Sequence, residues 1–213
     1  MTPPAAAYKT APTLARISAF PDCKTPPSPT KSTFLEAKKK QSEYSGYPVT
    51  YLRQIEDPLS LYLLGGWESV EKHTGEGQWL SLEVNQNLLA KLKDNVDVCW
   101  MFHLDIDPSK IPLDAPVLAM TRFFVDPSRK DEFDAAFKAG GSHTNACTAP
   151  FSSCGAWRID KEGEDEEFVL FSGWNEVADH LAFGGSETSG KFGRLKALAK
   201  DADVKHVHVE KWE

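Results

Sequence analysis

Two segments of the chain share one pattern: residues 66–73 read GWESVEKH, and residues 173–180 read GWNEVADH. Gly, Trp, Val and His recur at the same places, so both segments have the form Gly-Trp-x-x-Val-x-x-His, with an offset of 107 residues. A second match, Asp97-Val98 with Asp203-Val204, has an offset of 106. A nearly constant offset predicts a tandem duplication of one unit, with a chance match of short motifs as the alternative.

The patterns around the first segment predict seven elements. Thr33-x-x-Glu36 is a capping-box pattern, which indicates the start of a helix. Gly46 and Pro48 end that helix, and β-branched and aromatic residues in alternation then indicate strands. The predicted order is strand 14–20, helix 32–44, strands 49–55 and 61–67, short helix 68–73, helix 80–93 and strand 96–104.

The second segment lies in a similar series. Asp126-Pro127 is typical of a helix start, and Gly140-Gly141 predicts the end of that helix. The predicted order is strand 117–125, helix 126–140, strands 156–160 and 167–174, short helix 175–183, helix 188–200 and strand 204–211. Both halves therefore read β-α-β-β-α-β with an extra short helix, which is the ferredoxin-like order of the α+β class. We expect a disordered tail at 1–13 and two ferredoxin-like units at 14–106 and 117–213.

Composition limits the classes of function. The chain has 213 residues, 41% of them apolar, and a formal net charge of -7. The apolar content predicts a folded core, and the negative charge argues against nucleic acid as a partner. No apolar run is long enough to cross a membrane, and the first residues do not resemble a secretory signal, so we expect a cytoplasmic protein without a membrane partner. The four cysteines follow no disulfide or metal pattern, although Cys147 and Cys154 are close enough in sequence to form a pair.

The strand followed by Gly-Trp-(Glu/Asn)-x-Val-x-x-His resembles the signature of dimeric α/β-barrel proteins, in particular the antibiotic-biosynthesis-monooxygenase-like branch. The residues that carry the resemblance are Trp67, Glu68, Ser69 and His73 in the first half and Trp174, Asn175, Glu176 and His180 in the second. The resemblance implies that two ferredoxin-like sheets pack into a central barrel. Because one chain supplies both units, it implies a monomeric pseudo-dimer or a homodimer.

The same resemblance implies a ligand in an apolar cleft between a sheet and its helices. The family includes cofactor-free monooxygenases of polyketide quinones, polyketide cyclases, lactone isomerases, haem enzymes and stress proteins, so the fold does not select the reaction.

Histidines are the main candidates for chemistry. His73 and His180 lie about one and a half turns into their short helices, where a neutral imidazole could act as a general base. The structural alternative is a histidine at a helix end that packs on the preceding Trp. His206 and His208 lie on one face of the last strand, where they could bind a metal or orient a substrate, with a solvent-exposed face as the alternative. By the offset of 106, their counterparts in the first half are Trp100 and Phe102.

Other residues have candidate binding roles. Arg122 lies in an apolar strand and could stabilise an enolate or another anionic oxygen. Trp67, Trp174, Trp100 and Phe102 could enclose an aromatic ring, with a role in the core as the alternative for the two motif tryptophans. His143 lies among small polar residues that could form the rim of a pocket. His103, on the other face of its strand, is interpreted as a buried core histidine.

The sequence therefore predicts a small-molecule enzyme that acts on an apolar, aromatic or polyketide-like substrate. The expected chemistry is oxygenation without a cofactor, or proton transfer assisted by histidine that leads to cyclisation or isomerisation. No metal motif is present. One alternative is a haem enzyme with a histidine ligand, and another is a non-catalytic ligand-binding or stress-related protein.

Overall fold

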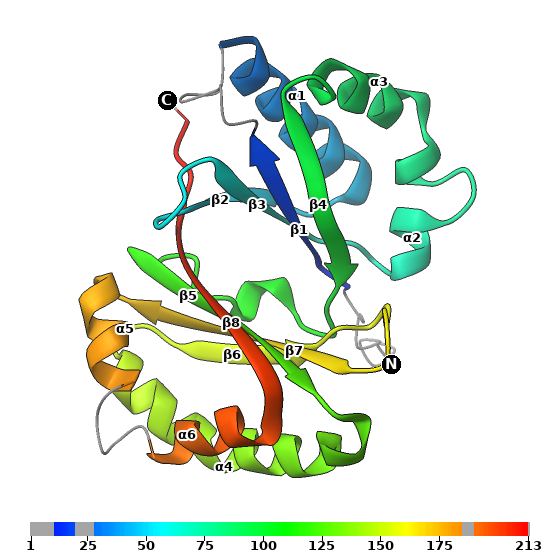
Figure 1. Ribbon diagram of the computed structural model, residues 1–213. Helices are drawn as coiled ribbons and strands as arrows, with labels where there is room; N and C mark the ends of the chain where they lie inside the picture. Colours follow the sequence, from blue (N-terminus) through cyan, green and yellow to red (C-terminus); the bar gives the residue numbers. More distant parts are fainter. Residues whose placement is uncertain (1–10, 20–27, 185–189, 213) are drawn as a thin grey trace, which may run out of the picture.

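A computed structural model describes residues 11–19, 28–184 and 190–212 (Figure 1). Most of the tail expected at 1–13 lies outside these ranges. In the N-terminal half the elements are β1 (Thr13–Ala19), α1 (Ser28–Ser45), β2 (Val49–Gln54), β3 (Ser60–Gly65), α2 (Val70–Thr74), the 3-10 helix η1 (Trp79–Ser81), α3 (Glu83–Leu92) and β4 (Val96–His103). A short 3-10 helix η2 (Pro108–Lys110) lies in the connection to the C-terminal half.

In the C-terminal half the elements are β5 (Val117–Val125), the 3-10 helix η3 (Pro127–Arg129), α4 (Lys130–Thr148), β6 (Ser153–Trp157), β7 (Glu166–Trp174), α5 (Val177–Gly184), α6 (Gly190–Leu198) and β8 (Ala199–Val209). Local signals explain two of the helix starts. Ser69 accepts a hydrogen bond from the backbone N–H of Lys72 at the start of α2, and Asp126 accepts one from Ser128 beside Pro127.

All eight strands form one antiparallel sheet in the order β4-β1-β3-β2-β8-β5-β7-β6. Each half thus contributes its own strands in the same order, with the last strand at one edge and the second strand at the other. The halves join where Arg53 of β2 pairs with His208 of β8. The two outer strands also meet, through a bridge between Leu104 and Arg158. This closure produces the barrel arrangement expected of an α/β-barrel protein.

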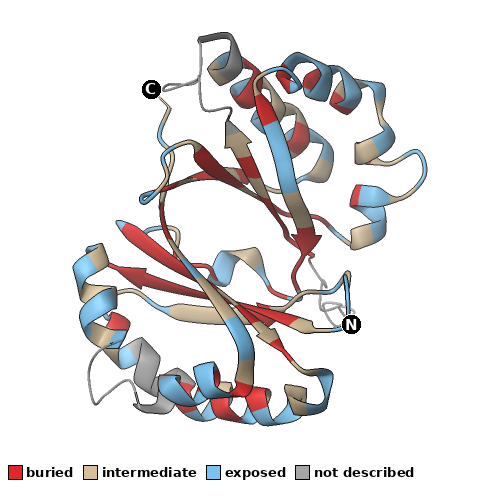
Figure 2. Cartoon of the chain, in the orientation of Figure 1, coloured by how far each residue is buried: buried red, intermediate tan, exposed pale blue. Residues whose placement is uncertain are grey.

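The helices cover the outer face of the sheet, α1 and α3 over the N-terminal half and α4 and α6 over the C-terminal half (Figure 1). Most residues of β2, β3, β5 and β7 are buried, whereas β4 and β8 are partly exposed and the helices expose their outer faces (Figure 2). The other face of the sheet encloses a core to which both halves contribute, because antiparallel strands alternate their side chains between two faces. The largest buried members of this core include Leu14, Leu52, Tyr62, Phe102, Leu104, Met120 and Phe171.

Several predicted boundaries were wrong. The helix α4 continues through Gly140 and Gly141 to Thr148. Glycine costs only about 1 kcal/mol per position in a helix, which packing against the sheet can offset. The strand β6 begins at Ser153 rather than at 156, and β8 begins at Ala199 rather than at 204. Tertiary pairing, with β7 for β6 and with β5 for β8, determines both starts.

None of the described helices is long and apolar enough to cross a membrane. Among the described cysteines, Cys147 and Cys154 are free thiols, so the disulfide that their spacing allowed is not formed. Cys99 is also free, and Cys23 lies outside the described residues.

Candidate active site

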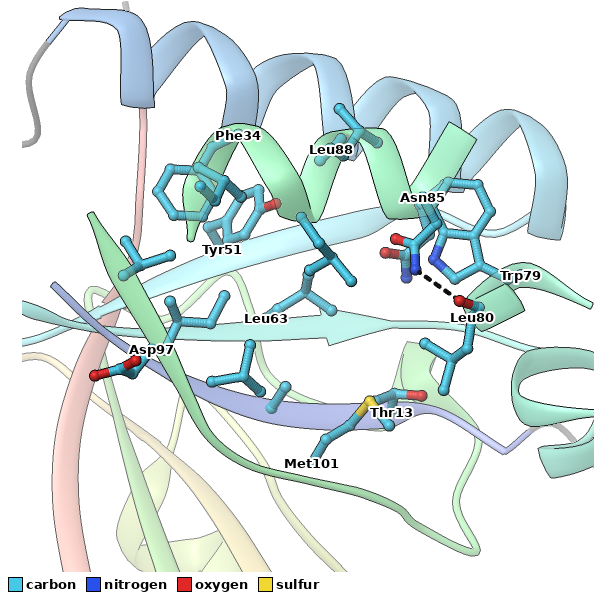
Figure 3. Close-up of a pocket in the computed structure, with 18 of the residues that line it drawn as sticks. Thr13, Phe34, Tyr51, Leu63, Trp79, Leu80, Asn85, Leu88, Asp97 and Met101 are labelled. Carbon is cyan, nitrogen blue, oxygen red and sulfur yellow. Dashed lines mark hydrogen bonds between the residues drawn. The ribbon is translucent and has the colours of Figure 1, made fainter. Parts of the chain in front are cut away.

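A cavity of about 460 Å³ lies in the N-terminal half between the outer face of the sheet and the helices α1 and α3 (Figure 3). Its volume falls in the range of small-molecule sites. Most of the lining is apolar, and it includes Ala15, Ile17, Phe34, Tyr51, Leu63, Trp79, Leu80, Leu88, Leu92, Val96 and Met101. The structure therefore contains an apolar cleft where the family resemblance implied one.

Several polar side chains of the lining gather at one end of this cavity. Figure 3 shows Thr13, Trp79 and Asn85 at one end and Phe34 and Tyr51 at the other. His73 belongs to the first end, because its Nδ1 lies 3.0 Å from Oγ1 of Thr13. A ligand in this cavity would place its polar end beside His73 and its apolar end beside the two aromatic rings.

His73 is the first member of a buried chain of hydrogen bonds. Its Nδ1 lies 2.8 Å from Nε2 of His103, and Nδ1 of His103 lies 3.0 Å from Oδ2 of Asp160. The backbone N–H of His103 donates to the other carboxylate oxygen, at 2.7 Å. Asp160 follows β6, so the C-terminal half supplies the carboxylate that ends a chain starting in the N-terminal half. We call these three residues the first relay.

The carboxylate determines which nitrogen of each imidazole carries the proton. Asp160 accepts from the Nδ1–H of His103, so Nε2 of a neutral His103 must accept from the Nδ1–H of His73. Nε2 of His73 then carries a lone pair, and no described residue donates a hydrogen bond to it. The ring of Trp67 stacks on His73 with centroids 4.2 Å apart, which holds the imidazole plane in place.

Burial keeps His73 neutral. Its surroundings lower its pKa from 6.5 to about 3, chiefly through the loss of solvation and secondly through repulsion by His103, with Asp160 opposing the shift. For Asp160, burial would raise the pKa, but the hydrogen bonds from His103 outweigh it and hold the pKa of the carboxyl below its usual value. At neutral pH the first relay therefore presents an unprotonated imidazole, backed by a charged carboxylate.

The C-terminal half contains a second relay of the same form. Nδ1 of His180 lies 2.7 Å from Nε2 of His206, and Nδ1 of His206 lies 2.5 Å from Oε1 of Glu56. Glu56 follows β2, so each relay takes its carboxylate from the other half. Trp174 contacts His180, with centroids 5.2 Å apart. Burial lowers the pKa of His180 to about 4, and repulsion by His206 adds to this effect.

The strand register corrects one predicted correspondence. Thr13 of β1 pairs with His103, and Ala119 of β5 pairs with His206. Thr13 also pairs with Gly65, and Ala119 with Ser172, each one residue before the repeated Gly-Trp. His206 therefore corresponds to His103, not to Trp100. A single offset of 106 does not apply to the whole chain. His103 and His206, in the last strands of the two halves, are 103 residues apart, whereas the two Gly-Trp-x-x-Val-x-x-His segments are 107 residues apart.

The two halves differ in the described residues that pack between the sheet and its helices. In the C-terminal half, Phe123 takes the position of Ile17, and both side chains point from the first strand toward the helices. Among the described residues of the C-terminal half, a packed cluster lies between this part of the sheet and its helices, and its buried members are Phe123, Val125, Phe133, Ala136, Phe168, Leu170, Leu195 and Leu198. The cavity beside His73 is the candidate site, because described residues line it throughout and a titratable imidazole lies in that lining.

Some predicted site residues lie elsewhere. Arg122 lies on the inner face of the sheet, where its Nε donates to Glu167 at 2.5 Å and its guanidinium lies 4.3 Å from the ring centroid of Trp100. Phe102 is fully buried in the same inner core. Arg122, Trp100 and Phe102 do not line the cavity, because alternate residues of a strand face opposite sides of the sheet. The position of Arg122 does not support contact with an enolate bound beside His73.

The remaining predicted residues have separate positions. Trp67 is buried beside His73, and Trp174 is buried beside His180. His208 pairs with Arg53 at the junction of the halves, away from the cavity lining. His143 lies in α4, and its side chain is outside the described ones. Within the described ranges, no three His, Cys, Asp or Glu side chains are grouped to hold a metal ion.

The hydrogen-bond partners of the histidines were not predicted from the sequence. His103 is buried as expected, but it links His73 to Asp160 rather than packing in an apolar core. No pattern in the sequence around Asp160 or Glu56 indicates that it contacts a histidine. These contacts form only because strands of the two halves pair with each other. A register-based alignment of the last strands would have paired His103 with His206.

The lowered pKa of His73 leads to a prediction for stability. The unfolded chain takes up a proton at His73 below about pH 6.5, whereas the folded chain does not until about pH 3. Stability should therefore fall as the pH drops through this window. Between about pH 7.5 and pH 5, protonation of His73 in the unfolded chain should by itself lower the free energy of unfolding by about 2 kcal/mol. Urea unfolding at both pH values should show a smaller loss for His73→Gln, and an equal loss would contradict the assignment.

Comparison of the sequence with protein-family models and with curated proteins finds no match. Solved structures with the same fold do exist. A "putative monooxygenase" of Fusobacterium nucleatum has a TM-score of 0.64 and 11% identity, with 97% of this chain and 94% of that chain covered. An anthrone oxidase-like protein has a TM-score of 0.66 and 14% identity, with 95% and 92% covered.

A variant of chlorite dismutase from Candidatus Nitrospira defluvii has a TM-score of 0.57 and 10% identity, with 97% of this chain and 93% of that chain covered. Identities this low show a common fold and nothing finer. The chain has the α/β-barrel fold of these proteins over nearly its whole length, and fold alone does not determine a reaction.

Proposed function

We propose that this protein is a small-molecule enzyme that removes a proton from an apolar, aromatic or polyketide-like substrate in the cavity of the N-terminal half. The observation that carries the proposal is the first relay: a neutral imidazole at the polar end of an apolar cavity, held by a second imidazole and a carboxylate. The proton transfer requires only this group of residues and a small hydrophobic molecule as the partner.

In the proposed step, Nε2 of His73 takes a proton from an acidic C–H of the substrate, which leaves an enolate. The Nδ1 proton of His73 moves to Nε2 of His103. The positive charge then lies on His103, next to the carboxylate of Asp160, instead of remaining on the desolvated ring of His73. The relay thus compensates for the low proton affinity of His73 alone.

The enolate can follow two courses. With dioxygen as the oxidant, a ring CH₂ group becomes C=O, and the second oxygen atom and the two hydrogens leave as water. Without dioxygen, return of the proton to another carbon gives isomerisation or ring closure. The anthrone oxidase-like neighbour favours the first course as the starting hypothesis, since an anthrone has such a CH₂ group.

A haem group fits the cavity less well. His73 is neutral and could serve as an axial ligand. The two propionates of haem need cationic partners, but among the described lining residues Lys93 is the one basic side chain besides the histidine, and Asp97 lies in the same lining. The described residues therefore favour a neutral ligand, and we assign no step to haem.

A non-catalytic ligand-binding or stress-related protein would be expected to have a closed cleft or one without polar groups, and histidines that face solvent. His73 is only 4% exposed and lines the cavity together with Tyr51, Lys93 and Asp97. These features favour an enzyme. We also propose that the two halves arose by tandem duplication and work as a pseudo-dimer within one chain, since each relay draws its carboxylate from the other half.

The proposal can be tested with anthrone as the substrate. Oxygen uptake and anthraquinone formation should proceed together in equal amounts, faster with the protein than in buffer. Exchange of the CH₂ hydrogens in D₂O under argon should also be faster, because exchange requires only the proton transfer. Accelerated exchange without oxygen uptake would favour isomerisation or cyclisation. If neither process is accelerated, proton abstraction from this class of compound is wrong.

A further inference from the structure

The cavity contains a polar side chain that the proton transfer does not use. Gln41, on α1, is 6% exposed and lines the cavity. Its carboxamide makes no hydrogen bond with any described residue. Inside the cavity this amide can pair with water or with a ligand, so a ligand that fills the space without pairing with it leaves the amide unsatisfied, at a cost of about 1–3 kcal/mol. This side chain points to a specific polar group on the ligand.

The position of Gln41 places it near the proposed base. A Cβ atom built on Gly65 would lie 2.4 Å from Nε2 of Gln41, so the amide occupies the space directly over this glycine. Gly65 pairs across the sheet with Thr13, whose hydroxyl contacts His73. The carboxamide and the imidazole are therefore neighbours at the same end of the cavity.

The C-terminal half has a different residue at the matching position. Ser172 stands where the N-terminal half has Gly65, and its hydroxyl accepts the indole N–H of Trp174 at 2.9 Å. With Gly65 in place of a serine, Nε1 of Trp67 is buried without a hydrogen-bond partner among the described residues. The glycine therefore leaves a polar atom of the core unpaired, and it leaves room for the Gln41 amide.

A second carboxamide lies at the same end. Asn85 is 7% exposed and lines the cavity, and its Nδ2 donates to the carbonyl of Leu80 only at 3.4 Å (Figure 3). Its Oδ1 has no hydrogen-bond partner among the described residues. Because that donor contact is long, Asn85 also has capacity for a ligand. The charged Asp97 lies toward the opposite end in Figure 3, so it does not compete for the same part of a bound molecule.

We propose that Gln41 selects substrates with a carbonyl or phenolic oxygen, by donating a hydrogen bond from Nε2 to that oxygen and holding the polar end of the molecule beside His73. Asn85 assists from α3. The substrate class is then an aryl ketone or phenol with an otherwise apolar ring system. That the end of the ligand beside His73 is the reactive one rests on the proposed function. Recognition of the oxygen by Gln41 can be measured by binding alone, without turnover.

Binding of two matched probes tests this recognition. 1-Naphthol and 1-methylnaphthalene have similar shapes and differ by a hydroxyl in place of a methyl group. The wild-type protein should bind 1-naphthol about tenfold more tightly, as expected for one hydrogen bond that satisfies a buried amide. In Gln41→Leu this preference should be lost, while the affinity for 1-methylnaphthalene should stay the same or rise. Titration calorimetry measures both constants.

Control variants separate recognition from damage to the fold. Asn87→Leu changes an exposed amide on α3 that does not line the cavity, and it should keep the wild-type preference. Gly65→Ala should lower the preference by displacing the Gln41 amide, and it decides the test if Gln41→Leu does not fold. An unchanged preference in a folded Gln41 or Gly65 variant would overturn the proposal, as would a wild-type protein without any preference. Failure of anthrone turnover alone would contradict only the proposed function.

Discussion

Replacing His73 by Gln is expected to lower the rate of anthrone oxidation by about 10²- to 10⁴-fold, the usual contribution of a general base. Gln can still hydrogen-bond to His103, but it cannot take a proton from the substrate. The loss should appear in kcat, while the affinity for 1-methylnaphthalene should change little because the apolar lining is intact. Initial rates of oxygen uptake over a range of substrate concentrations measure the loss in kcat, and titration calorimetry measures the affinity.

His180→Gln is the matched control for this experiment. It changes the corresponding histidine of the second relay, in the half whose described residues include the packed cluster around Phe123. Its rate should stay within about twofold of wild type if the site lies only in the N-terminal half. Equal losses in both variants would place the chemistry in both halves, and full activity in His73→Gln would exclude His73 as the base.

Asp160→Asn is expected to lower the same rate by about 10²-fold, although Asp160 does not line the cavity. The neutral amide cannot stabilise a positive charge on His103, and it can present an N–H that reverses the hydrogen bonds along the relay. Asp160 is therefore a positioning residue for the base. The charge of Asp160 raises the pKa of His73, so without the carboxylate His73 should hold a proton less readily and the acid limb of the pH profile of kcat should shift toward lower pH.

Glu56→Gln is the matched control, because Glu56 has the same place in the second relay. Both substitutions remove one carboxylate that links the two halves, so any general loosening of the barrel should affect both variants similarly. Asp160→Glu should recover part of the activity by restoring the charge. If Asp160→Asn and Glu56→Gln lose activity equally and the pH profile does not move, Asp160 has only a structural role.

Short-range patterns predicted much of the fold. The strands at β2 and β3 and the helices that begin near Ser69 and Asp126 follow from alternation and capping residues that lie within a few positions of each other. Boundaries failed where pairing partners decide them, as at β6 and β8. The candidate role of Arg122 rested on residue type alone, because the sequence does not show which face of the sheet its strand position presents.

The amino-acid sequence by itself determined the two similar series of elements and the repeated Trp and His, because these depend on local periodicity and composition. Only the tertiary structure decided what His73 can do. Its partners His103 and Asp160 lie 30 and 87 positions further along the chain, and strand register brings the three together. Tertiary packing also decided where a ligand can bind: the small Ile17 and Gly65 leave space beside His73, whereas in the described part of the C-terminal half Phe123 takes the place of Ile17 and packs in a cluster.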